Sequence, residues 1–409
     1  MTAAPQPLRT PSERRLRLVA FAAIAIGLVI RSVPLLRQPE APLSTCDGRA
    51  YYQLAVSLAR GDGFVLSDPF LQTACEGHLT LGPSHHFAPG LPIIEAFFVT
   101  LFGDGRLALV VPLILLSWLA VAFALWTTND LYGTDAALLV GAAVSLDWTG
   151  SYHGTFLGYS ENLVMIVITV TLWAILRAIR SDRFVLFAGM AAGIGYLSKA
   201  SIGWFFIIAG IGGFIYRLMF RGWGVLRNGW YWAAIGIFAL PVALWSYRNL
   251  SLFWDGSPVG LIDAWQTSGV ISGLVANAFA HPDQLLIGLG GKLPVMAGLL
   301  LLPYLPFVDV LWRQLKEWRS EEVFGLWLAI GLIFVLGWFF GAVFWVTDQT
   351  SLLWADNVRY VMPASIALLW LIVRGEARPA IWRWSICFLI LFVTAMLPPT
   401  YYLPEFAPA

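Results

Sequence analysis

The two acids with the clearest chemical potential, Asp47 and Glu161, stand where helices are expected to begin. Asp47 lies in the stretch CDGRAYY (46–52), and Glu161 lies in YSEN (159–162). A carboxylate in the first turn of a helix at a membrane surface can serve as a general base. The alternative for each is a capping carboxylate that only stabilises the N–H groups at the start of its own helix. The sequence alone leaves both interpretations open.

Three cations lie apart from the other basic residues, again close to expected helix ends. Lys199 is found in GYLSKA, Arg248 in WSYRN, and Arg359, followed by Tyr360, in DNVRY. Converging Lys and Arg donors are what a phosphate group requires. The alternative is that each side chain extends separately to lipid headgroups. Because two acids are expected on the same side of a membrane, we favour a substrate site in which the three cations meet a phosphate.

Two adjacent histidines, His85 and His86, precede an apolar stretch. Zinc is an alternative, with His78 and Glu76 nearby, but sequence neighbours rarely converge on one ion without further ligands. We predict instead that they hydrogen-bond a sugar or a phosphate. No ligand cluster supports a divalent metal, and no cofactor is predicted. Tyr51 and other aromatic residues suit sugar faces, although membrane-interface belts account for most of the 20 Trp and 13 Tyr.

The chain has three cysteines. Cys46 and Cys75 both fall in the first segment expected outside the cytoplasm, where a disulfide can form. Two free thiols are the alternative for this pair. Cys387 lies within an apolar run and is expected to be inert packing.

Long apolar runs must position these residues. Of the 409 residues, 59% are hydrophobic and 12% are charged, whereas a soluble domain carries roughly 25% charged residues. Continuous runs reach the ~20 residues that cross a hydrocarbon core, which excludes a porin-like barrel of alternating strands. A net charge of +1 offers no basic face for nucleic acid. The predicted crossings are 18–36, 107–126, 136–148, 163–176, 184–197, 202–220, 230–247, 293–312, 323–346, 360–373 and 381–397.

Most of the 25 Lys and Arg residues fall in clusters that separate these runs. The clusters are Arg9/Arg14/Arg15/Arg17, Arg177/Arg180/Arg183, Arg217/Arg221/Arg227, Arg313/Lys316/Arg319 and Arg374/Arg378/Arg383. Basic residues concentrate on the cytoplasmic ends of transmembrane helices, so these clusters mark the cytoplasmic face. The run 18–36 has no convincing signal-peptide cleavage site around Arg31, and we interpret it as a retained first helix.

The apolar stretch 88–103 is short and contains Glu95. If it crossed the membrane, the later basic clusters would lie opposite the first one, so we predict a helix lying in the membrane interface. A second, amphipathic helix is predicted over Asp47–Arg60, ending at Gly61. The predicted fold is therefore an all-α, polytopic membrane helical bundle of about eleven transmembrane helices, with these two interfacial helices in the first outer loop.

The prediction treats residues 1–409 as a single transmembrane domain. Two segments are long and expected outside: 37–106, which carries both interfacial helices, and 248–292. The N-terminus is expected inside and the C-terminus outside. We expect a multi-pass protein of a bacterial or archaeal cytoplasmic membrane, with its site facing outwards.

Taken in order, these stretches resemble the integral-membrane glycosyltransferases of the GT-C superfamily. The resemblance is greatest to the branch that contains the protein mannosyltransferases and the aminoarabinose transferase of lipid A. The similar stretches are DGRAYYQLAVSLARGDGF (47–64), HHFAPGLPIIEAFFVTLFG (85–103), GYSENL (158–163), GIGYLSKA (193–200), WSYRN (245–249) and RYVMP (359–363). Each is weak alone, but together they follow the family's order across nearly the whole chain.

The resemblance implies a sugar donor carried on a polyprenyl phosphate and transferred with inversion on the outer face. Asp47 matches the position of the family's catalytic base, and Glu161 resembles its second acid. Lys199, Arg248 and Arg359 match positions where basic residues face the lipid phosphate.

The sequence also departs from the family's pattern. Gly48 stands where many relatives have a second acid, and Ala88 replaces the first proline of a Pro-Pro-Gly motif. These departures leave the substrate open.

The main alternative is a transporter or flippase of a lipid-linked sugar. Such proteins usually carry charges within helices and paired broken helices. Here the candidates crowd one face, and Asp147 and Asp309 lie near helix ends, so we favour the transferase. A non-catalytic subunit of a membrane complex is a further alternative. The sugar and the acceptor, whether lipid, polysaccharide or protein, stay open.

Overall fold

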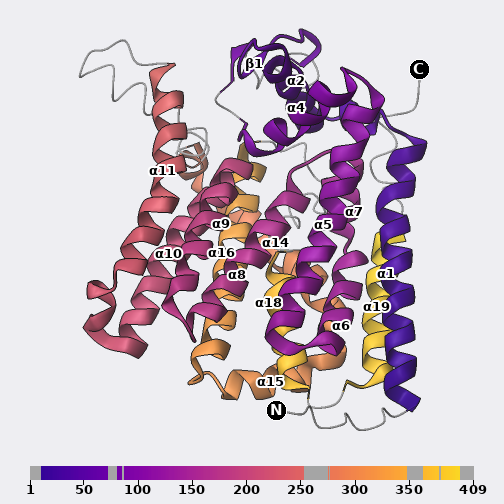
Figure 1. Cartoon of the computed structure of the whole chain (residues 1–409), viewed down its shortest axis with the longest axis vertical. Helices are drawn as coiled ribbons and strands as arrows, with labels where there is room; N and C mark the ends of the chain where they lie inside the picture. Colours follow the sequence, from indigo (N-terminus) through magenta and orange to yellow (C-terminus); the bar gives the residue numbers. More distant parts are fainter. Residues whose placement is uncertain are drawn as a thin grey trace, which may run out of the picture.

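The computed structural model describes residues 11–71, 81–84, 87–252, 275, 277–347, 363–376 and 379–396. In this part of the chain the fold is a helical bundle (Figure 1). Its regular β-structure is one short antiparallel pair, β1 (Val65–Leu66) with β2 (Gly82–Pro83). The predicted all-α membrane bundle is confirmed.

Helices that run along the bundle alternate in direction from one end of the molecule to the other (Figure 1). They are α1 (Pro11–Arg37), α5 (Arg106–Tyr132), α6 (Thr134–Ser145), α8 (Glu161–Ala178), α9 (Val185–Ser198), α10 (Ala200–Arg221), α11 (Gly229–Ser251), α14 (Pro282–Leu301), α16 (Glu321–Thr347), α18 (Ala364–Gly375) and α19 (Ile381–Met396). Shorter elements join them: η1 (Ala41–Ser44), α2 (Cys46–Arg60), α4 (Gly90–Phe102), α7 (Trp148–Ser151), the π-helix η2 (Tyr152–Phe156), η3 (Asp182–Phe184), η4 (Gly222–Arg227), η5 (Leu302–Phe307) and α15 (Val308–Lys316).

Most predicted crossings in the described part of the chain fall on single helices, although 136–148 runs past the end of α6 at Ser145 and 184–197 begins at the last residue of η3. The segment 293–312 was predicted as one helix, and this is wrong: α14 ends at Leu301, the chain turns through η5, and α15 follows. Pro303 and Pro306 interrupt the helix here, because proline lacks the N–H that a helix interior needs. Five of the described helices are long and apolar enough to cross a membrane. The predicted number of crossings stays a prediction.

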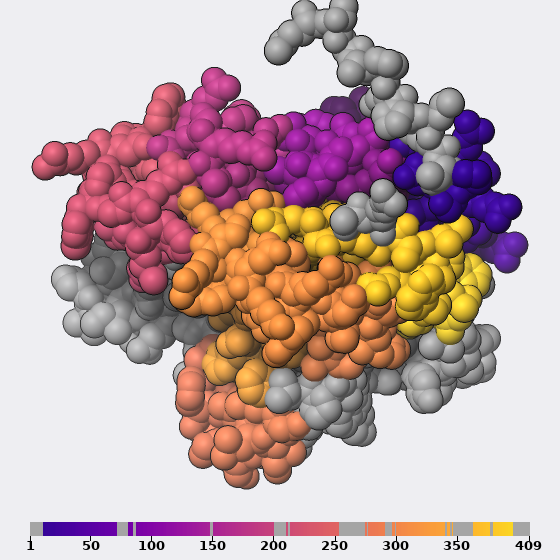
Figure 2. Space-filling view, turned by 90° about the horizontal axis from the view of Figure 1, so that it is seen from below, coloured from indigo at the N-terminus to yellow at the C-terminus, as the bar shows by residue number. Residues whose placement is uncertain are grey.

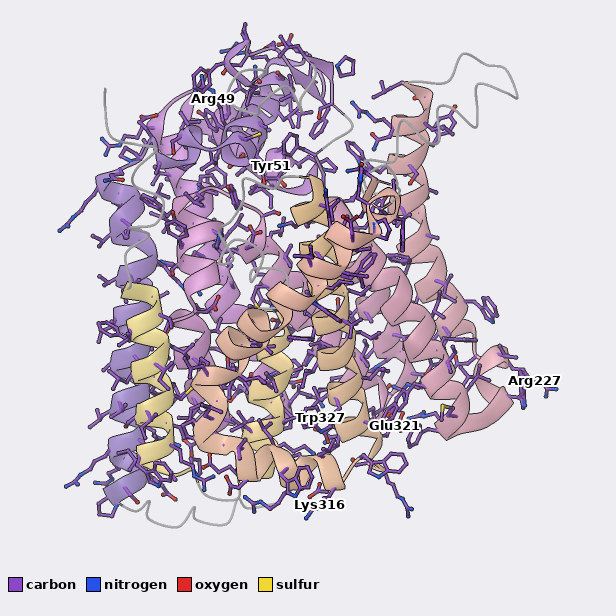
Figure 3. All side chains as sticks on the ribbon, turned by 180° about the vertical axis from the view of Figure 1, so that it is seen from behind. Arg49, Tyr51, Arg227, Lys316, Glu321 and Trp327 are labelled. Carbon is purple, nitrogen blue, oxygen red and sulfur yellow. The ribbon has the colours of Figure 1, made fainter. Side chains whose placement is uncertain are left out.

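The two ends of the bundle differ in charge. We call the end that carries η4 and α15 the basic end; Arg227 and Lys316 lie there (Figure 3). The other end, which we call the α2–α4 end, carries the first long segment, with Arg49 and Tyr51 (Figure 3). Ion pairs join the turns at the basic end: Arg17 with Asp135, Arg177 with Asp130, Arg217 with Glu321, Arg374 with Glu317 and Arg383 with Asp309.

Seen from the basic end, the C-terminal helices pack along one side of a row formed by the N-terminal helices (Figure 2). The main apolar core lies between these two groups. Helix α18 is buried within it, and its Trp370 donates a hydrogen bond of 2.8 Å to Thr128 of α5. This buried contact ties the two halves of the chain together.

The two helices predicted in the first long segment are present as α2 and α4, which lie across one end of the bundle (Figure 1). Their place in the membrane interface stays a prediction. Thr45 caps α2 by accepting a hydrogen bond of 3.1 Å from the N–H of Gly48, and Gly61 ends the helix with a φ of 87°. A positive φ is accessible to glycine at low cost. Helix α4 exposes Phe97 and its apolar neighbours, as expected of a helix that lies against lipid.

Candidate active site

The first turn of α2 is held against the chain that leads into α8. Thr45 donates a hydrogen bond of 3.3 Å from its Oγ1 to the carbonyl of Leu157, in the loop just before Glu161. Gly48 makes the closest approach: a Cβ there would lie 2.4 Å from the carbonyl oxygens of both Leu157 and Pro42. A larger residue at position 48 would force these backbone segments apart.

Asp47 lies in this turn and is half-buried. The alternative in which Asp47 is the N-cap of α2 is wrong, because Thr45 fills that role. Its neighbours Thr45 and Gly48 contact Leu157, which holds this turn of α2 against the loop before α8. The role of Asp47 as a base stays a prediction.

Glu161 and Lys199 form a buried ion pair. The ammonium of Lys199 lies 2.5 Å from Oε1 of Glu161, and the side chains are 14% and 5% exposed. Glu161 begins α8, whereas Lys199 stands between α9 and α10. The alternative in which Lys199 extends to lipid headgroups is therefore wrong. Glu161 and Lys199, which were predicted separately as an acid and a cation of the site, form one ion pair.

Arg248 ties the last turn of α11 to the first long segment. Its guanidinium donates to the carbonyl oxygens of Ser84 and Phe64, the latter at 3.4 Å. It also lies over the rings of Phe64 and Trp245, at 5.5 and 5.0 Å from their centroids. A cation over an aromatic face is attracted by the ring's quadrupole. Arg248 is half-buried among these groups rather than extended to headgroups.

Apolar contacts bring the same elements together. Tyr51 of α2 packs edge-on against Phe87, with ring centroids 5.1 Å apart, inside a cluster that includes Leu163 of α8. Gly90 begins α4 against the end of α9: a Cβ there would lie 3.1 Å from Oγ of Ser198. The residue after Ser198 is Lys199. The first turns of α2, α4 and α8 thus converge beside the Glu161–Lys199 pair.

The sequence interpretation missed a buried arginine in α1. Arg31 is 2% exposed and donates hydrogen bonds to three other helices. Its bonds go to the carbonyls of Ser145 and Val144 at 2.9 and 2.5 Å, and to Ser117 and Asn162 at 3.0 and 3.1 Å. A single arginine within an apolar run is a signal of function in membrane proteins, and that signal was available.

A second missed residue is Glu95 of α4. It was used only as an argument against a membrane crossing, yet it is 1% exposed. Its Oε2 atom has no hydrogen-bond partner among the described residues. Burial raises the pKa of Glu95 well above its ordinary value. Burial therefore disfavours the charged form of this carboxyl in the contact of α4 with the bundle.

Several predicted site residues lie outside the described part of the chain. They are Arg359, Tyr360, His85, His86 and Cys75. Cys46 is disulfide-bonded, and its pairing with Cys75 stays a prediction. Cys387 is a free, buried thiol, as predicted. Among the described residues, no group of His, Cys, Asp and Glu is arranged to hold a metal ion.

Comparisons with known proteins give one family-model match and several similar structures. Residues 86–247 match the family model of dolichyl-phosphate-mannose-protein mannosyltransferase. The crystal structure of ArnT from Cupriavidus metallidurans bound to undecaprenyl phosphate is similar, with a TM-score of 0.54 and 16% identity over 92% of this chain and 62% of that chain. The apo structure of ArnT gives a TM-score of 0.53 and 16% identity over 91% and 61%. A search of curated proteins gives no match.

A third structure is that of the Archaeoglobus fulgidus oligosaccharyltransferase complex with Zn and sulfate. It gives a TM-score of 0.50 and 12% identity over 92% of this chain and 52% of that chain. The chain thus spans about three fifths of the length of the ArnT structures and about half of the archaeal one. The expected fold is confirmed: the chain shares the helical fold of these solved structures and is a multi-pass membrane protein.

Proposed function

We propose that this protein is a glycosyltransferase that moves a sugar from a polyprenyl-phosphate donor to an acceptor hydroxyl. The reaction takes place at the α2–α4 end, on the outer face of the membrane. The observation that carries the proposal is the buried Glu161–Lys199 pair beside the first turn of α2, in a GT-C fold. The ArnT structure bound to undecaprenyl phosphate supports a donor of this class.

The lipid phosphate meets the cations at this end. In the proposed complex Lys199 and Arg248 donate to the phosphate oxygens, joined by Arg359. Lys199 is already desolvated and Arg248 is half-buried, so their charges act more strongly on a phosphate than exposed cations do. The polyprenyl tail lies in the lipid against the bundle.

Asp47 acts as general base. Its carboxylate takes the proton of the acceptor hydroxyl as that oxygen attacks the anomeric carbon from the side opposite the phosphate. The bond between the anomeric carbon and the phosphate oxygen breaks, and its electron pair leaves with the polyprenyl phosphate. The cations stabilise the charge that grows on this leaving group, which is the larger electrostatic contribution in such sites. The anomeric configuration inverts.

A transporter of a lipid-linked sugar is the second candidate. It is favoured by one observation, the buried Arg31 in a membrane-spanning helix, because intramembrane charges often line transport paths. Against it, Arg31 is bonded on several sides to fixed backbone and side-chain groups. Sealed vesicles separate the two: a transporter moves the donor across the membrane without breaking its sugar–phosphate bond.

The test is the variant Asp47→Asn with release of polyprenyl phosphate as the readout. This product is common to all donors, so a panel of polyprenyl-phosphate-linked sugars can be used before the natural sugar is known. Loss of the general base lowers the rate by ~10²–10⁴-fold. The variant keeps its fold, because Thr45 rather than Asp47 caps α2.

The matched control is Asp62→Asn, an exposed carboxylate in the same segment. Its release rate is expected to equal that of the wild type. A rate of Asp47→Asn within a few-fold of the wild type would remove Asp47 from the role of base.

A further inference from the structure

The first turn of α8 is not held by a cap of its own. Ser160 is the N-cap residue and makes no side-chain capping hydrogen bond. The next two residues, Glu161 and Asn162, are both buried. Something other than local capping must fix this turn, which carries one half of the Glu161–Lys199 pair.

Asn162 supplies that support. Its Nδ2 donates hydrogen bonds to the carbonyl of Gly150 at 3.1 Å and to Oγ1 of Thr155 at 3.0 Å. Its Oδ1 accepts from Nη1 of Arg31 at 3.1 Å. The amide is thus bonded on both sides, which fixes its orientation. Thr155 in turn donates to Gly150 at 2.9 Å, which closes the ring of contacts.

Arg31 anchors this arrangement to the rest of the bundle. Its bonds to Val144 and Ser145 satisfy carbonyls at the C-terminal end of α6, where helical carbonyls lack partners and a cation is stabilising. Asp147 supplies the opposing negative charge. The guanidinium presents its donors in a rigid planar fork, so it can hold several helices in one geometry.

Two glycines leave room for these contacts. A Cβ at Gly150 would lie 2.5 Å from Nη1 of Arg31 and 2.9 Å from Oδ1 of Asn162. A Cβ at Gly154 would lie 2.7 Å from Nδ2 of Asn162. The backbone around the amide is therefore packed too closely for any side chain, as expected where one position must be held within a fraction of an ångström.

We propose that Arg31 is a positioning residue: through Asn162 it holds the first turn of α8, and so keeps the Glu161 carboxylate on Lys199. The effect of this positioning on catalysis rests on the proposed function. Arg31 itself touches no substrate. Its role is geometric, and it links α1, α5 and α6 to the site.

The test measures the ion pair directly in the full chain in lipid nanodiscs. An acetylating reagent labels lysine amines, and mass spectrometry gives the ratio of labelled Lys199 to labelled Lys316, which is exposed. In Arg31→Gln the ratio rises on the order of tenfold, the change expected when one hydrogen bond to a charged group is lost. Arg31→Lys does not restore protection, since one ammonium cannot reach the acceptors of all three helices.

The matched control is Arg217→Gln, which removes an equally buried arginine at the basic end. It lowers stability but leaves the Lys199 ratio unchanged. If Arg31→Gln does not fold, Asn162→Ala tests the same path while keeping the bonds of Arg31 to α6. An unchanged Lys199 ratio in the folded variants overturns the proposal.

The labelling ratio does not depend on transfer. If it rises in Arg31→Gln while the wild type releases no polyprenyl phosphate from any donor, the positioning role stands and the proposed function fails. If wild-type release is observed, kcat/KM in Arg31→Gln falls by roughly 10–100-fold, because misplacement by about 1 Å is costly in a preorganised site. Unchanged kcat/KM with a raised labelling ratio would overturn the catalytic meaning of the contact.

Discussion

The basic end and the α2–α4 end differ in the groups that their buried charges contact. At the basic end, arginines meet carboxylates from neighbouring helices, as in the pairs Arg374–Glu317 and Arg383–Asp309, both at 2.8 Å. Several of these partners are about half exposed; Glu317 and Asp309 are 52% and 53% exposed. At the α2–α4 end, Arg31 is buried on carbonyl and amide oxygens, and the Oε2 atom of buried Glu95 has no described partner.

This difference in partners indicates two roles for charged residues in the fold. Exposed pairs contribute little stability because solvent screens them, and they occur at both ends: Arg60 and Asp104 at the α2–α4 end are 62% and 44% exposed. Buried charges cost free energy and are retained where a site uses them. Among the described residues, buried Arg31 and Glu95 make no hydrogen bond to an oppositely charged side chain, and both lie towards the α2–α4 end. Buried Arg217 at the basic end instead pairs with Glu321. This contrast is the physical reason for locating the site there.

The largest expected effect on stability comes from neutralising first one and then both residues of the buried Glu161–Lys199 pair. Glu161→Gln and Lys199→Met each leave one buried charge unpaired and lower the free energy of unfolding by ~3–5 kcal/mol. The double variant recovers most of that stability, because two neutral groups replace two charges. Thermal unfolding in detergent measures the stability, and release of polyprenyl phosphate measures activity, which the double variant does not recover.

The basic end supplies the comparison for this cycle. Arg217 and Glu321 form a pair with side chains 5% and 19% exposed. The double variant Arg217→Met/Glu321→Gln is expected to recover both stability and activity. If the double variants at the two ends behave alike in activity, the distinction between the ends is lost.

A medium effect is expected at Gly48. In Gly48→Ala the added methyl group meets the carbonyls of Leu157 and Pro42, so the first turn of α2 moves away from the loop before α8. Overpacking of this kind costs ~1–3 kcal/mol, and the displacement lowers the release rate by roughly 100-fold. Gly236→Ala on α11 is the control, because a Cβ there has open space. If Gly48→Ala and Gly236→Ala release polyprenyl phosphate at equal rates, the contact of Gly48 with Leu157 does not position the site.

The smallest effect concerns Glu95 and depends on pH. Its ordinary pKa is 4.5, and burial raises the pKa in the fold. Between these two values the folded protein binds more protons than the unfolded chain, so stability falls as pH rises above about 4.5. Glu95→Gln removes this penalty. Its melting temperature should exceed that of the wild type at pH 8, and the difference should shrink towards pH 5.

Tyr52 interacts electrostatically with Glu95, and its hydroxyl donates a hydrogen bond to Asp104. Asp62→Asn, an exposed carboxylate, serves as the control and should show no such pH dependence. A Glu95→Gln variant that is less stable than the wild type at pH 8 would indicate an ionised, functional Glu95 instead.

Much of the fold could be predicted because apolar length and the placement of basic residues fix where helices lie. The helix Asp47–Arg60 was predicted almost to the residue, since Gly61 is a clear stop. The segment 293–312 failed, because hydropathy stays high through Pro303 and Pro306 although the helix cannot continue there. Hydropathy reports burial in lipid and says nothing of backbone continuity.

The site was predictable only where a charge stands at a helix end. Glu161 and Lys199 were identified in this way, but their pairing was not, because it depends on how α8 and α9 pack. The contacts of Arg31 could not be predicted for the same reason: two of its acceptors are backbone carbonyls of α6, which carry no sequence signal, and the other two are side chains of α5 and α8. The position of Arg31 within an apolar run nevertheless indicated a functional residue.

The most direct measurement is a structure of the full chain with undecaprenyl phosphate bound. The account predicts a phosphate at the α2–α4 end, with its oxygens within hydrogen-bond distance of Lys199 and Arg248 and with Asp47 facing the position of the sugar. A phosphate bound at the basic end, near Arg227 or Lys316, would contradict it.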